Sequence, residues 1–438
     1  MSIRHSCQSI ALLCAIAVAT RIIVFLVCQP VAYPDTETYY LLISHILNFD
    51  FSQYVGHRSP GYSILIILGG QNEILIWIIQ SALGVMISLL LYNICLAHTG
   101  SEKLSFLTGL IHTISLNQLA FETRRMPETM TTFCIVLSIY FLVQALREHT
   151  CPTRGIATGI VAATAALTRP LYIYLGPLYA ILVLMFEKDL KRIAVNIAIA
   201  SFALVIGWML FNKVTINYFG LQTVSGYGIT NHSGRFMERA GDEYATIRDI
   251  YLKYRAENIR KTGSHSMTIF LAKDEMLEKT GLDEVALSRQ LAKISIELFM
   301  MEPARYLRDV GEAWVDFWRI RLDIGENFTV PAAREVTYAI WRIERWVLML
   351  ANLLAMIACI YVAARDVSYR YKGRSGLSAP LIIACILVAA SVFQAFAEYG
   401  ENSRYAVPTQ SLAVLLVILV AWDLRIAYKV RSADTLSP

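Results

Sequence analysis

Long apolar stretches separated by short polar ones dominate the chain. A membrane-spanning helix needs about 17–25 mostly apolar residues. Eight stretches meet this length: 8–30, 74–98, 104–120, 128–146, 192–212, 338–363, 378–396 and 408–424. A ninth stretch, 155–186, is interrupted by Thr168-Arg169-Pro170, and a proline after a charged residue indicates a turn. We therefore interpret 155–186 as two short spans, so that the pattern predicts about ten transmembrane helices.

The composition excludes several classes of protein. Of the 438 residues, 56% are hydrophobic and 17% are charged, against about 45–50% and about 25% in soluble proteins. A soluble enzyme, a disordered chain and a disulfide scaffold are therefore excluded. The first apolar stretch could be a signal peptide, but Arg21 interrupts it and we expect an uncleaved helix. The eight cysteines form no C-x-x-C pair, so we interpret them as packing residues.

The positions of the basic residues predict the orientation of the spans. With the N-terminus in the cytoplasm, fourteen Lys and Arg residues fall in or beside inner loops and five in short outer loops. Cytoplasmic loops carry such an excess, so we expect both termini in the cytoplasm. The net charge of +5 is spread over these loops, without the basic, aromatic-rich face of a nucleic-acid-binding protein. We therefore predict membrane lipids, and no nucleic acid, as partners.

Two polar regions then face the outer side, 31–73 and 213–337. The second holds 17 of the 39 Lys and Arg residues and 18 of the 34 Asp and Glu residues, and we expect a small helical domain. Apolar residues at helical spacing predict amphipathic helices over 287–298 and 306–317, the latter on the membrane surface. The predicted parts are 1–212 (a transmembrane module with a catalytic outer loop), 213–337 (an extracytoplasmic domain) and 338–438 (C-terminal transmembrane helices).

Two groups of ionisable residues in the first outer loop are candidates for chemistry. Asp35 and Glu37 follow Pro34 and suit a general base, a metal or an amine, although Asp35 could instead cap the next helix. Arg58 precedes Gly61 and could hold a phosphate, or its side chain could simply reach lipid headgroups. A charge near hydrocarbon is costly, which favours a functional interpretation of such residues.

Further candidates lie between later spans. Glu128 opens a span at the positive end of a helix. The preceding Arg124 and Arg125 indicate an anionic ligand, or they could simply pair with Glu122. Arg169 and Arg404 could contact a phosphate, or could neutralise Glu398 and Glu401. The histidines show no metal-ligand spacing, and nucleotide-binding and hydrolase motifs are absent from the sequence.

The order of these motifs resembles the GT-C superfamily of membrane glycosyltransferases. The motifs are Pro34-Asp35…Tyr39, Arg58-Ser59-Pro60-Gly61-Tyr62, Pro127-Glu128, Arg169-Pro170 and Glu401-Asn402-Ser403-Arg404-Tyr405…Pro408. More narrowly, the chain is similar to bacterial relatives of the protein O-mannosyltransferases and of the lipid A aminoarabinose transferases. Asp35 matches the catalytic Asp of the first loop. Many members carry an adjacent Asp-Glu pair, whereas Glu37 stands one residue further on.

The resemblance implies an inverting hexosyl- or pentosyltransferase with a GT-C-like, all-α polytopic fold. It would transfer a sugar from a polyprenyl-phosphate donor to a glycan, lipid or protein on the extracytoplasmic face of the bacterial inner membrane. It implies no fixed cofactor and leaves a divalent metal open. The implied roles are Asp35 as general base; Arg58, Arg169 and Arg404 on the donor phosphate; and Glu37, Tyr62, Glu128 and Glu401 in substrate positioning.

Two other functions remain open at the level of sequence. A polysaccharide polymerase or ligase would use an oligosaccharide on pyrophosphate at the same membrane face. A transporter or flippase of lipid-linked sugars would place ionisable residues or broken helices in the middle of its spans. Only Arg21 lies clearly within an apolar stretch, which favours an enzyme.

Overall fold

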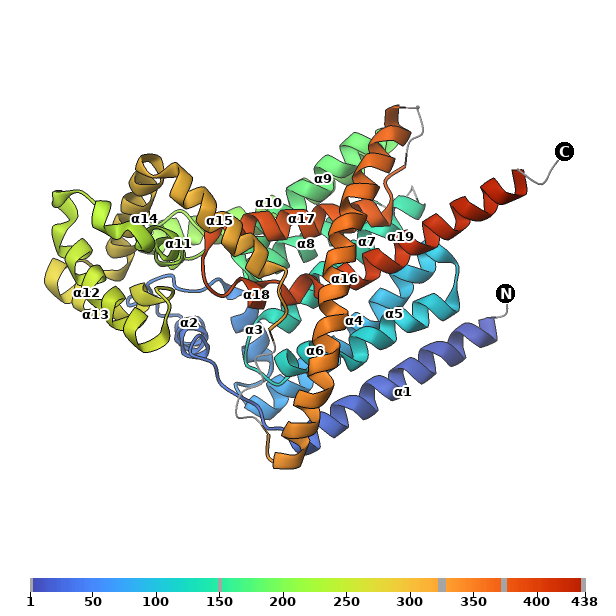
Figure 1. The fold of residues 1–438 in the computed structure, drawn as a ribbon, viewed down its shortest axis with the longest axis horizontal. Helices are drawn as coiled ribbons and strands as arrows, with labels where there is room; N and C mark the ends of the chain where they lie inside the picture. The colour runs from blue at the N-terminus through green and yellow to red at the C-terminus, as the bar shows by residue number, and fades with distance from the viewer. Residues whose placement is uncertain (1–2, 149–151, 322–327, 372–375, 435–438) are drawn as a thin grey trace.

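The computed structural model describes residues 3–148, 152–321, 328–371 and 376–434, and these residues form an all-α protein (Figure 1). Within this part of the chain the only β contacts are two isolated bridges, Cys28 with Phe328 and Val31 with Arg124. The fold confirms the prediction of an all-α polytopic membrane protein. The seven cysteines in the described part are free, and Cys151 lies outside it.

Eleven of the helices correspond to the predicted apolar stretches. They are α1 (Ile3–Val27), α4 (Glu73–Thr99), α5 (Glu102–Ile114), α6 (Leu116–Glu122), α7 (Glu128–Glu148), α8 (Pro152–Thr168), α9 (Leu175–Phe186), α10 (Lys191–Ile216), α16 (Pro331–Tyr371), α17 (Ala379–Ala397) and α19 (Val407–Asp434). Seven helices in the described part are long and apolar enough to span a membrane, and α5 with α6, bent by 54°, would make an eighth.

This number is smaller than the ten predicted spans because the helices on either side of Pro170 are short. The predicted break is present: Arg169 adopts extended backbone angles and Pro170 opens the short 3-10 helix η1 (Pro170–Tyr174) before α9. Proline fits the first position of a helix because it has no N–H group to donate. Helix α8 has 17 residues and the apolar segment Pro170–Phe186 is similarly short, so both stand at the lower limit of the length of a membrane span.

The remaining α-helices lie in the polar regions or between the last two spans. They are α2 (Thr36–Asn48), α3 (Pro60–Leu68), α11 (Ser225–Ser233), α12 (Ala245–Thr262), α13 (Thr268–Thr280), α14 (Glu284–Met301), α15 (Pro303–Phe317) and α18 (Asn402–Tyr405). Short 3-10 helices complete the fold: η2 (Lys188–Leu190), η3 (Gly234–Arg239) and η4 (Asp242–Tyr244).

Both amphipathic helices predicted in the second polar region are present. The predicted apolar face of α14, Leu287, Leu291, Ile294 and Leu298, is buried in a core that α14 shares with α11, α12 and α13. The face of α15 is buried at Val310, Ala313 and Phe317. Helix α15 packs on the outer part of α17, where Trp314 donates a hydrogen bond to Ser391 at 3.2 Å.

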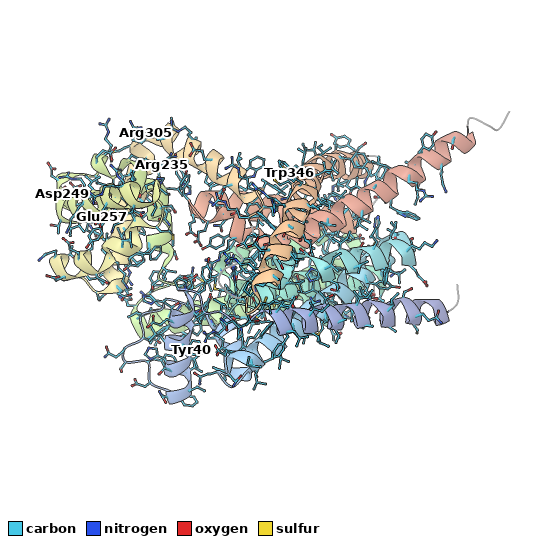
Figure 2. All side chains as sticks on the ribbon, turned by 60° about the horizontal axis from the view of Figure 1, so that its bottom comes forward. Tyr40, Arg235, Asp249, Glu257, Arg305 and Trp346 are labelled. Carbon is cyan, nitrogen blue, oxygen red and sulfur yellow. The ribbon has the colours of Figure 1, made fainter. Side chains whose placement is uncertain are left out.

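Helices α11 to α15, which belong to the predicted outer region 213–337 and are called the outer helices below, gather at one end of the molecule. Both termini lie at the opposite end (Figure 1). Figure 2 shows Arg235, Asp249, Glu257 and Arg305 among the helices at the first end, whereas Trp346 lies on α16. The short helices α2, α3 and α18 lie between this charged group and the apolar bundle (Figure 1). The polar regions of the sequence are therefore brought together at one end of the bundle.

The bundle contains a buried ion pair that explains why Arg21 lies within an apolar stretch and which residue Glu122 contacts. Arg21 of α1 donates to Glu122 at the end of α6 over 2.5 Å, and both side chains are buried. Glu122 therefore pairs with the intramembrane Arg21 and not with the neighbouring Arg124 or Arg125. Pairing inside a helix bundle is the usual condition for a charge at membrane depth, so Arg21 needs no transport role.

Candidate active site

A cavity of about 480 Å³ lies where the outer helices meet the bundle. Its wall combines the loop before α2, the start of η1, and the segment from α17 to α18. Residues of α11 and α13 complete the wall on the side of the outer helices. A cavity of this size, with a few convergent polar groups among apolar ones, is typical of a small-molecule site.

The backbone before α2 leaves the Asp35 carboxylate free to face this cavity. Asp35 occupies the position before the first turn of α2, but its side chain caps no backbone N–H group. The hydroxyl of Thr36 instead accepts the N–H of Tyr33 at 2.8 Å, and the hydroxyl of Thr38 donates to the Asp35 carbonyl at 2.7 Å. The alternative interpretation of Asp35 as a helix cap is therefore wrong.

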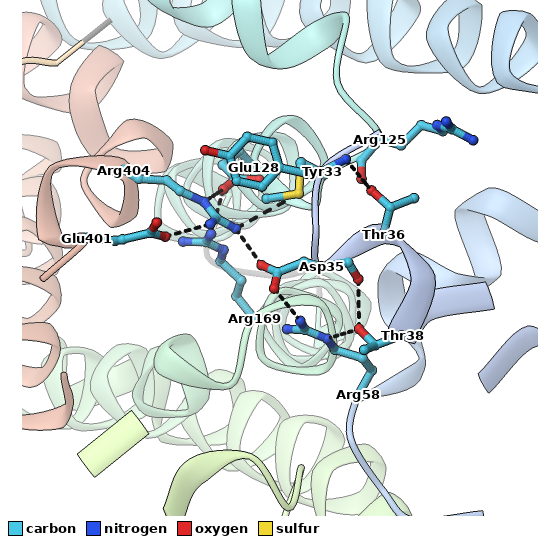
Figure 3. Close-up of polar contacts among 11 residues, drawn as sticks. Tyr33, Asp35, Thr36, Thr38, Arg58, Arg125, Glu128, Arg169, Glu401 and Arg404 are labelled. Carbon is cyan, nitrogen blue, oxygen red and sulfur yellow. Dashed lines mark hydrogen bonds and ion pairs between the residues drawn. The ribbon is translucent and has the colours of Figure 1, made fainter. Parts of the chain in front are cut away.

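Asp35 lies between two arginines that are far apart in sequence (Figure 3). Its Oδ1 is 2.8 Å from Nη2 of Arg58, and its Oδ2 is 2.9 Å from Nη2 of Arg404. Arg58 also donates from Nε to the hydroxyl of Thr38 at 2.7 Å. The first outer loop and the segment before the last span are thus joined through one carboxylate.

Arg404 extends the network to two further carboxylates. Its Nε lies 2.9 Å from Oε1 of Glu128, and its Nη1 lies 2.7 Å from Oε2 of Glu401. Glu128 in turn contacts Nη2 of Arg169 at 2.6 Å. Three arginines and three carboxylates therefore alternate, and their formal charges cancel.

The arginines determine the protonation of Asp35. Burial opposes ionisation of this carboxyl, but Arg58 and Arg404 outweigh the burial and lower its pKa to about 2. Asp35 is therefore ionised throughout the physiological range. A carboxylate with so low a pKa is a good hydrogen-bond acceptor and electrostatic partner but a weak base.

Aromatic rings hold the three guanidinium groups in place. Arg58 lies over Tyr39 at 4.8 Å from the ring centroid, and Arg404 lies over Tyr33 at 5.0 Å. Arg169 lies over Tyr405 at 4.4 Å. Such cation–π contacts stabilise a guanidinium group by about 0.5–2 kcal/mol and restrict its orientation.

Two buried polar atoms of the network have no hydrogen-bond partner. They are Nη1 of Arg169 and Oε2 of Glu128. A buried unpaired donor is costly, and Arg169 also lines the cavity. Within the described part of the chain, this Arg169 nitrogen is left without an acceptor.

The structure brings together six of the eight predicted site residues, namely Asp35, Arg58, Glu128, Arg169, Glu401 and Arg404 (Figure 3). Tyr62 is fully buried behind them; its hydroxyl donates to Gln80 at 2.8 Å and its ring meets Tyr39 edge-on. Glu37 is exposed on the first turn of α2 and is not among the residues that line the cavity.

From the sequence, Glu398 is expected only as a carboxylate that Arg169 or Arg404 could neutralise, but it lines the same cavity and the ion pairs among the described residues join Arg404 to Glu401 instead. Burial raises the pKa of this carboxyl to about 7. Its Oε1 lies 3.4 Å from Nδ2 of the fully buried Asn231, a residue of α11. Glu398 stands three positions before Glu401, but its link to Asn231 depends on how α11 docks and leaves no signal in the sequence.

The carboxylates do not form a suitable metal site. Within the described ranges, no group of three or more His, Cys, Asp or Glu side chains could hold a metal ion. Each oxygen of Asp35 faces a guanidinium group, and a divalent cation would have to displace these positive charges. The residues present therefore do not fit a divalent metal, and no step below is assigned to one.

A family model for dolichyl-phosphate-mannose-protein mannosyltransferase matches residues 62–216, about a third of the chain. This match confirms the resemblance to membrane glycosyltransferases and supports such an activity. The matched part runs from α3 to the end of α10 and includes Glu128 and Arg169, whereas Asp35, Arg58 and Arg404 lie outside it. No curated protein sequence matches the chain.

Two solved structures of the oligosaccharyltransferase from Archaeoglobus fulgidus are similar to the chain. One, tethered by a disulfide to an acceptor peptide with the NVT sequon, is 16% identical with a TM-score of 0.48, and the alignment covers 98% of this chain and 51% of that one. The other, with an inhibitory peptide and a dolichol-phosphate, is 15% identical with a TM-score of 0.48, over 99% and 52%. The chain therefore spans about half the length of these structures.

Proposed function

We propose that the protein transfers a sugar from a polyprenyl-phosphate-linked donor to an acceptor on the extracytoplasmic side of the membrane. The observation that carries this proposal is the convergence of Asp35, Arg58, Arg169 and Arg404 on one cavity beside the apolar bundle, with the buried Glu128 behind them in contact with both Arg169 and Arg404. The family match over residues 62–216 supports the same class of reaction. The acceptor, a glycan, lipid or protein, would approach from the side of the outer helices.

Arg169 is the best candidate for the donor phosphate. Its Nη1 has no partner, whereas the three nitrogens of Arg404 already contact Glu128, Glu401 and Asp35. A charge-assisted hydrogen bond from Arg169 would stabilise the phosphate as it leaves with the bonding electrons. Arg58 and Arg404 are paired with carboxylates and hold the network together.

The apolar part of the cavity wall suits a polyprenyl chain. Leu171 and Ile173 of η1 and Phe393 of α17 line the cavity beside Arg169. Ile173 and Phe393 are 45% and 52% exposed, so part of each side chain is open to a ligand. A lipid carrier could therefore lie against these side chains with its phosphate at the arginines.

Asp35 would meet the acceptor on the other side of the sugar. As an ionised carboxylate it can accept a hydrogen bond from the attacking group and align it with the anomeric carbon. Attack opposite to the leaving phosphate gives inversion at that carbon. In this proposal Glu128 and Glu401 orient Arg404, Tyr62 supports Tyr39, and Glu37 has no role in the cavity.

The charge pattern and the shape of the molecule support the proposed orientation. The basic loops predict cytoplasmic termini, and α11 to α15 lie at the end opposite to the termini (Figure 1). The cavity borders these helices, so it would face the extracytoplasmic side. A bacterial inner membrane protein with this orientation would take its donor from the outer leaflet.

Mass spectrometry of lipids and glycans from cells with and without the gene tests the proposal. We expect deletion to cause one polyprenyl-phosphate sugar to accumulate and one glycan unit to be lost. An accumulated pyrophosphate-linked oligosaccharide would instead indicate a polymerase or ligase. Unchanged glycans would contradict the proposal and favour transport.

A further inference from the structure

Glu398 differs from the other carboxylates of the cavity wall because it has no arginine partner. Three carboxylates from the described part of the chain line the cavity: Asp35, Glu398 and Glu401. Asp35 and Glu401 both form ion pairs with Arg404. Among the described ion pairs none includes Glu398. Of the three carboxylates, it is therefore the one that is not engaged in an ion pair of the site.

Neutral groups from two parts of the fold position Glu398. It follows the last residue of α17 in an extended conformation, and its N–H donates to the carbonyl of Gln394. Its carboxyl group accepts a hydrogen bond from Nδ2 of Asn231 at 3.4 Å. Asn231 also accepts the N–H of Met267 at 3.0 Å, and Met267 lines the cavity in the left-handed backbone region.

The charges around Glu398 leave it able to take up and release a proton. Burial is the main cause that raises its pKa to about 7, and the nearby Glu401 and Asp35 act in the same direction. The Tyr405 hydroxyl and Arg404 oppose them.

Four ionisable groups at or around the adjacent Tyr399 do not change charge near neutral pH. His232 and His265 contact the adjacent Tyr399 by their rings, and burial lowers the pKa of both imidazoles to about 4. Arg235 lies over the Tyr399 ring, and the pKa values of its guanidinium and of the Tyr399 hydroxyl are both raised. Of the groups named around this position, Glu398 alone titrates near pH 7.

We propose that Glu398, which faces the cavity without an arginine partner, accepts the proton of the acceptor hydroxyl during sugar transfer. This inference rests on the proposed function. The hydroxyl O–H bond breaks towards Glu398 while the oxygen forms its bond to the anomeric carbon. The bond from that carbon to the phosphate oxygen breaks, and its electron pair leaves with the phosphate beside Arg169. Asp35 aligns the hydroxyl but stays ionised throughout.

The division of work between the two carboxylates has a physical basis. A general base is most effective when its pKa lies near the working pH, because it is then both deprotonated and strong enough to take a proton. Asp35, with a pKa of about 2, meets only the first condition. A fixed ionised Asp35 and a titrating Glu398 in one cavity meet both conditions.

The pH profile of the wild-type protein and the variant Glu398→Gln test the inference. Purified protein in nanodiscs would be assayed with a polyprenyl-phosphate hexose and the acceptor identified from the glycan analysis. We expect wild-type kcat/KM to fall about tenfold per pH unit below pH 7. We expect Glu398→Gln, which can still accept from Asn231, to lower kcat by about 100-fold or more with little change in donor KM, and to lose this pH dependence.

Two comparisons separate proton transfer from positioning. Asp35→Asn should lower the rate but keep a fall in activity in acid, moved to a lower pH because the Asp35 charge that raises the pKa of Glu398 is gone. Glu302→Gln, the same chemical change in the turn between α14 and α15 and outside the cavity, should leave both rate and profile unchanged.

A flat wild-type profile between pH 5.5 and 8 would overturn the inference even if the variant failed to fold. Activity of a folded Glu398→Gln within about threefold of wild type would overturn it as well. Wild-type protein that transfers no sugar from any polyprenyl-phosphate donor would instead contradict the proposed function, and the inference with it.

Discussion

Arg404 is the residue on which the candidate site depends most. Its guanidinium group contacts Asp35, Glu128 and Glu401, which come from three separate parts of the chain, and its side chain is only 12% exposed. A guanidinium group can satisfy three carboxylates at once because its donors point in fixed directions within one plane. An ammonium group has the same charge but lacks this planar geometry.

Arg404→Lys should therefore damage the site although it keeps the charge. We expect sugar transfer to fall by about 10- to 100-fold and the protein to unfold at a lower temperature, because at least one buried carboxylate loses its partner. Thermal unfolding in detergent and the transfer assay measure the two effects.

Arg305→Lys is the matched control, since Arg305 is 45% exposed and pairs with Glu302 at 3.5 Å on the surface. Exposed pairs contribute about 0–1 kcal/mol, so the control should resemble the wild type. Equal behaviour of both variants would show that Arg404 is not the centre of the site.

At the scale of helices, the crossing of α8 and α10 depends on glycine. A Cβ atom added at Gly159 would lie 2.5 Å from the carbonyl oxygen of Ile197 and 2.9 Å from Cβ of Ala200. Small residues allow this kind of close approach between membrane helices. Helix α8 ends at Thr168, so its packing on α10 also fixes the position of Arg169.

Gly159→Ala should destabilise the protein by about 1–3 kcal/mol, because two backbones would have to separate. Gly207→Ala on α10 provides the control, since no atom lies within 4 Å of a Cβ at that position. There the same change should be neutral or slightly stabilising, because alanine favours helix more than glycine does. A higher unfolding temperature for Gly159→Ala than for Gly207→Ala would contradict this account.

A polar contact between His57 and Glu284 joins the predicted first outer loop to the start of α14. Glu284 contacts His57, the neighbour of Arg58, and also Lys273 at 3.1 Å. The hydrogen bond from His57 is the main cause that lowers the pKa of Glu284 to about 2, and burial opposes it. The contact therefore joins the loop that carries Arg58 to the outer helices.

This contact should respond to acid in a defined direction. The pKa of Glu284 is lower in the folded protein than in an unfolded chain, so its stabilisation is complete above about pH 4.5 and is lost as the pH falls towards 2. As the pH falls from about 4.5 towards 2, the exchange rate of the amides in residues 50–59, relative to their intrinsic rate at the same pH, should rise in the wild type. In Glu284→Gln exchange should be faster already at neutral pH and should change less with acid. Identical curves for the two proteins would contradict the assignment.

At the scale of the whole molecule, the proposed orientation can be measured directly. Lys261 lies exposed on α12 among the outer helices, and Lys429 lies exposed near the end of α19. In intact cells, a membrane-impermeant maleimide should label Lys261→Cys but not Lys429→Cys beyond the wild-type background. The reverse pattern would place the cavity on the cytoplasmic side.

The sequence predicted the apolar helices well because a bilayer demands long uninterrupted stretches. The predicted and observed numbers differ at Pro170, where two helical segments of about 17 residues each stand at the lower limit of span length. Asp35 and Arg404 could be placed in one site only through the order of the motifs, because no local pattern links residues 369 positions apart.

The contact between Asn231 and Glu398 was beyond prediction for a different reason. Asn231 belongs to a helix whose docking depends on packing among α11 to α14, and periodicity indicates which face of such a helix is buried but not what it meets. The exposed position of Glu37 is a related case, since a shift of two residues along α2 turns a side chain away from Asp35.

The charge balance among the three arginines and three carboxylates has a consequence for turnover. A phosphodiester donor carries one negative charge, whereas the polyprenyl phosphate left after transfer is a monoester with about −1.5 to −2. A pocket of free arginines would bind that product more tightly than the donor and would be inhibited by it. Because Asp35, Glu128 and Glu401 already share these cations, the spent carrier would meet a neutral pocket with one spare donor on Arg169, and could leave for the next donor.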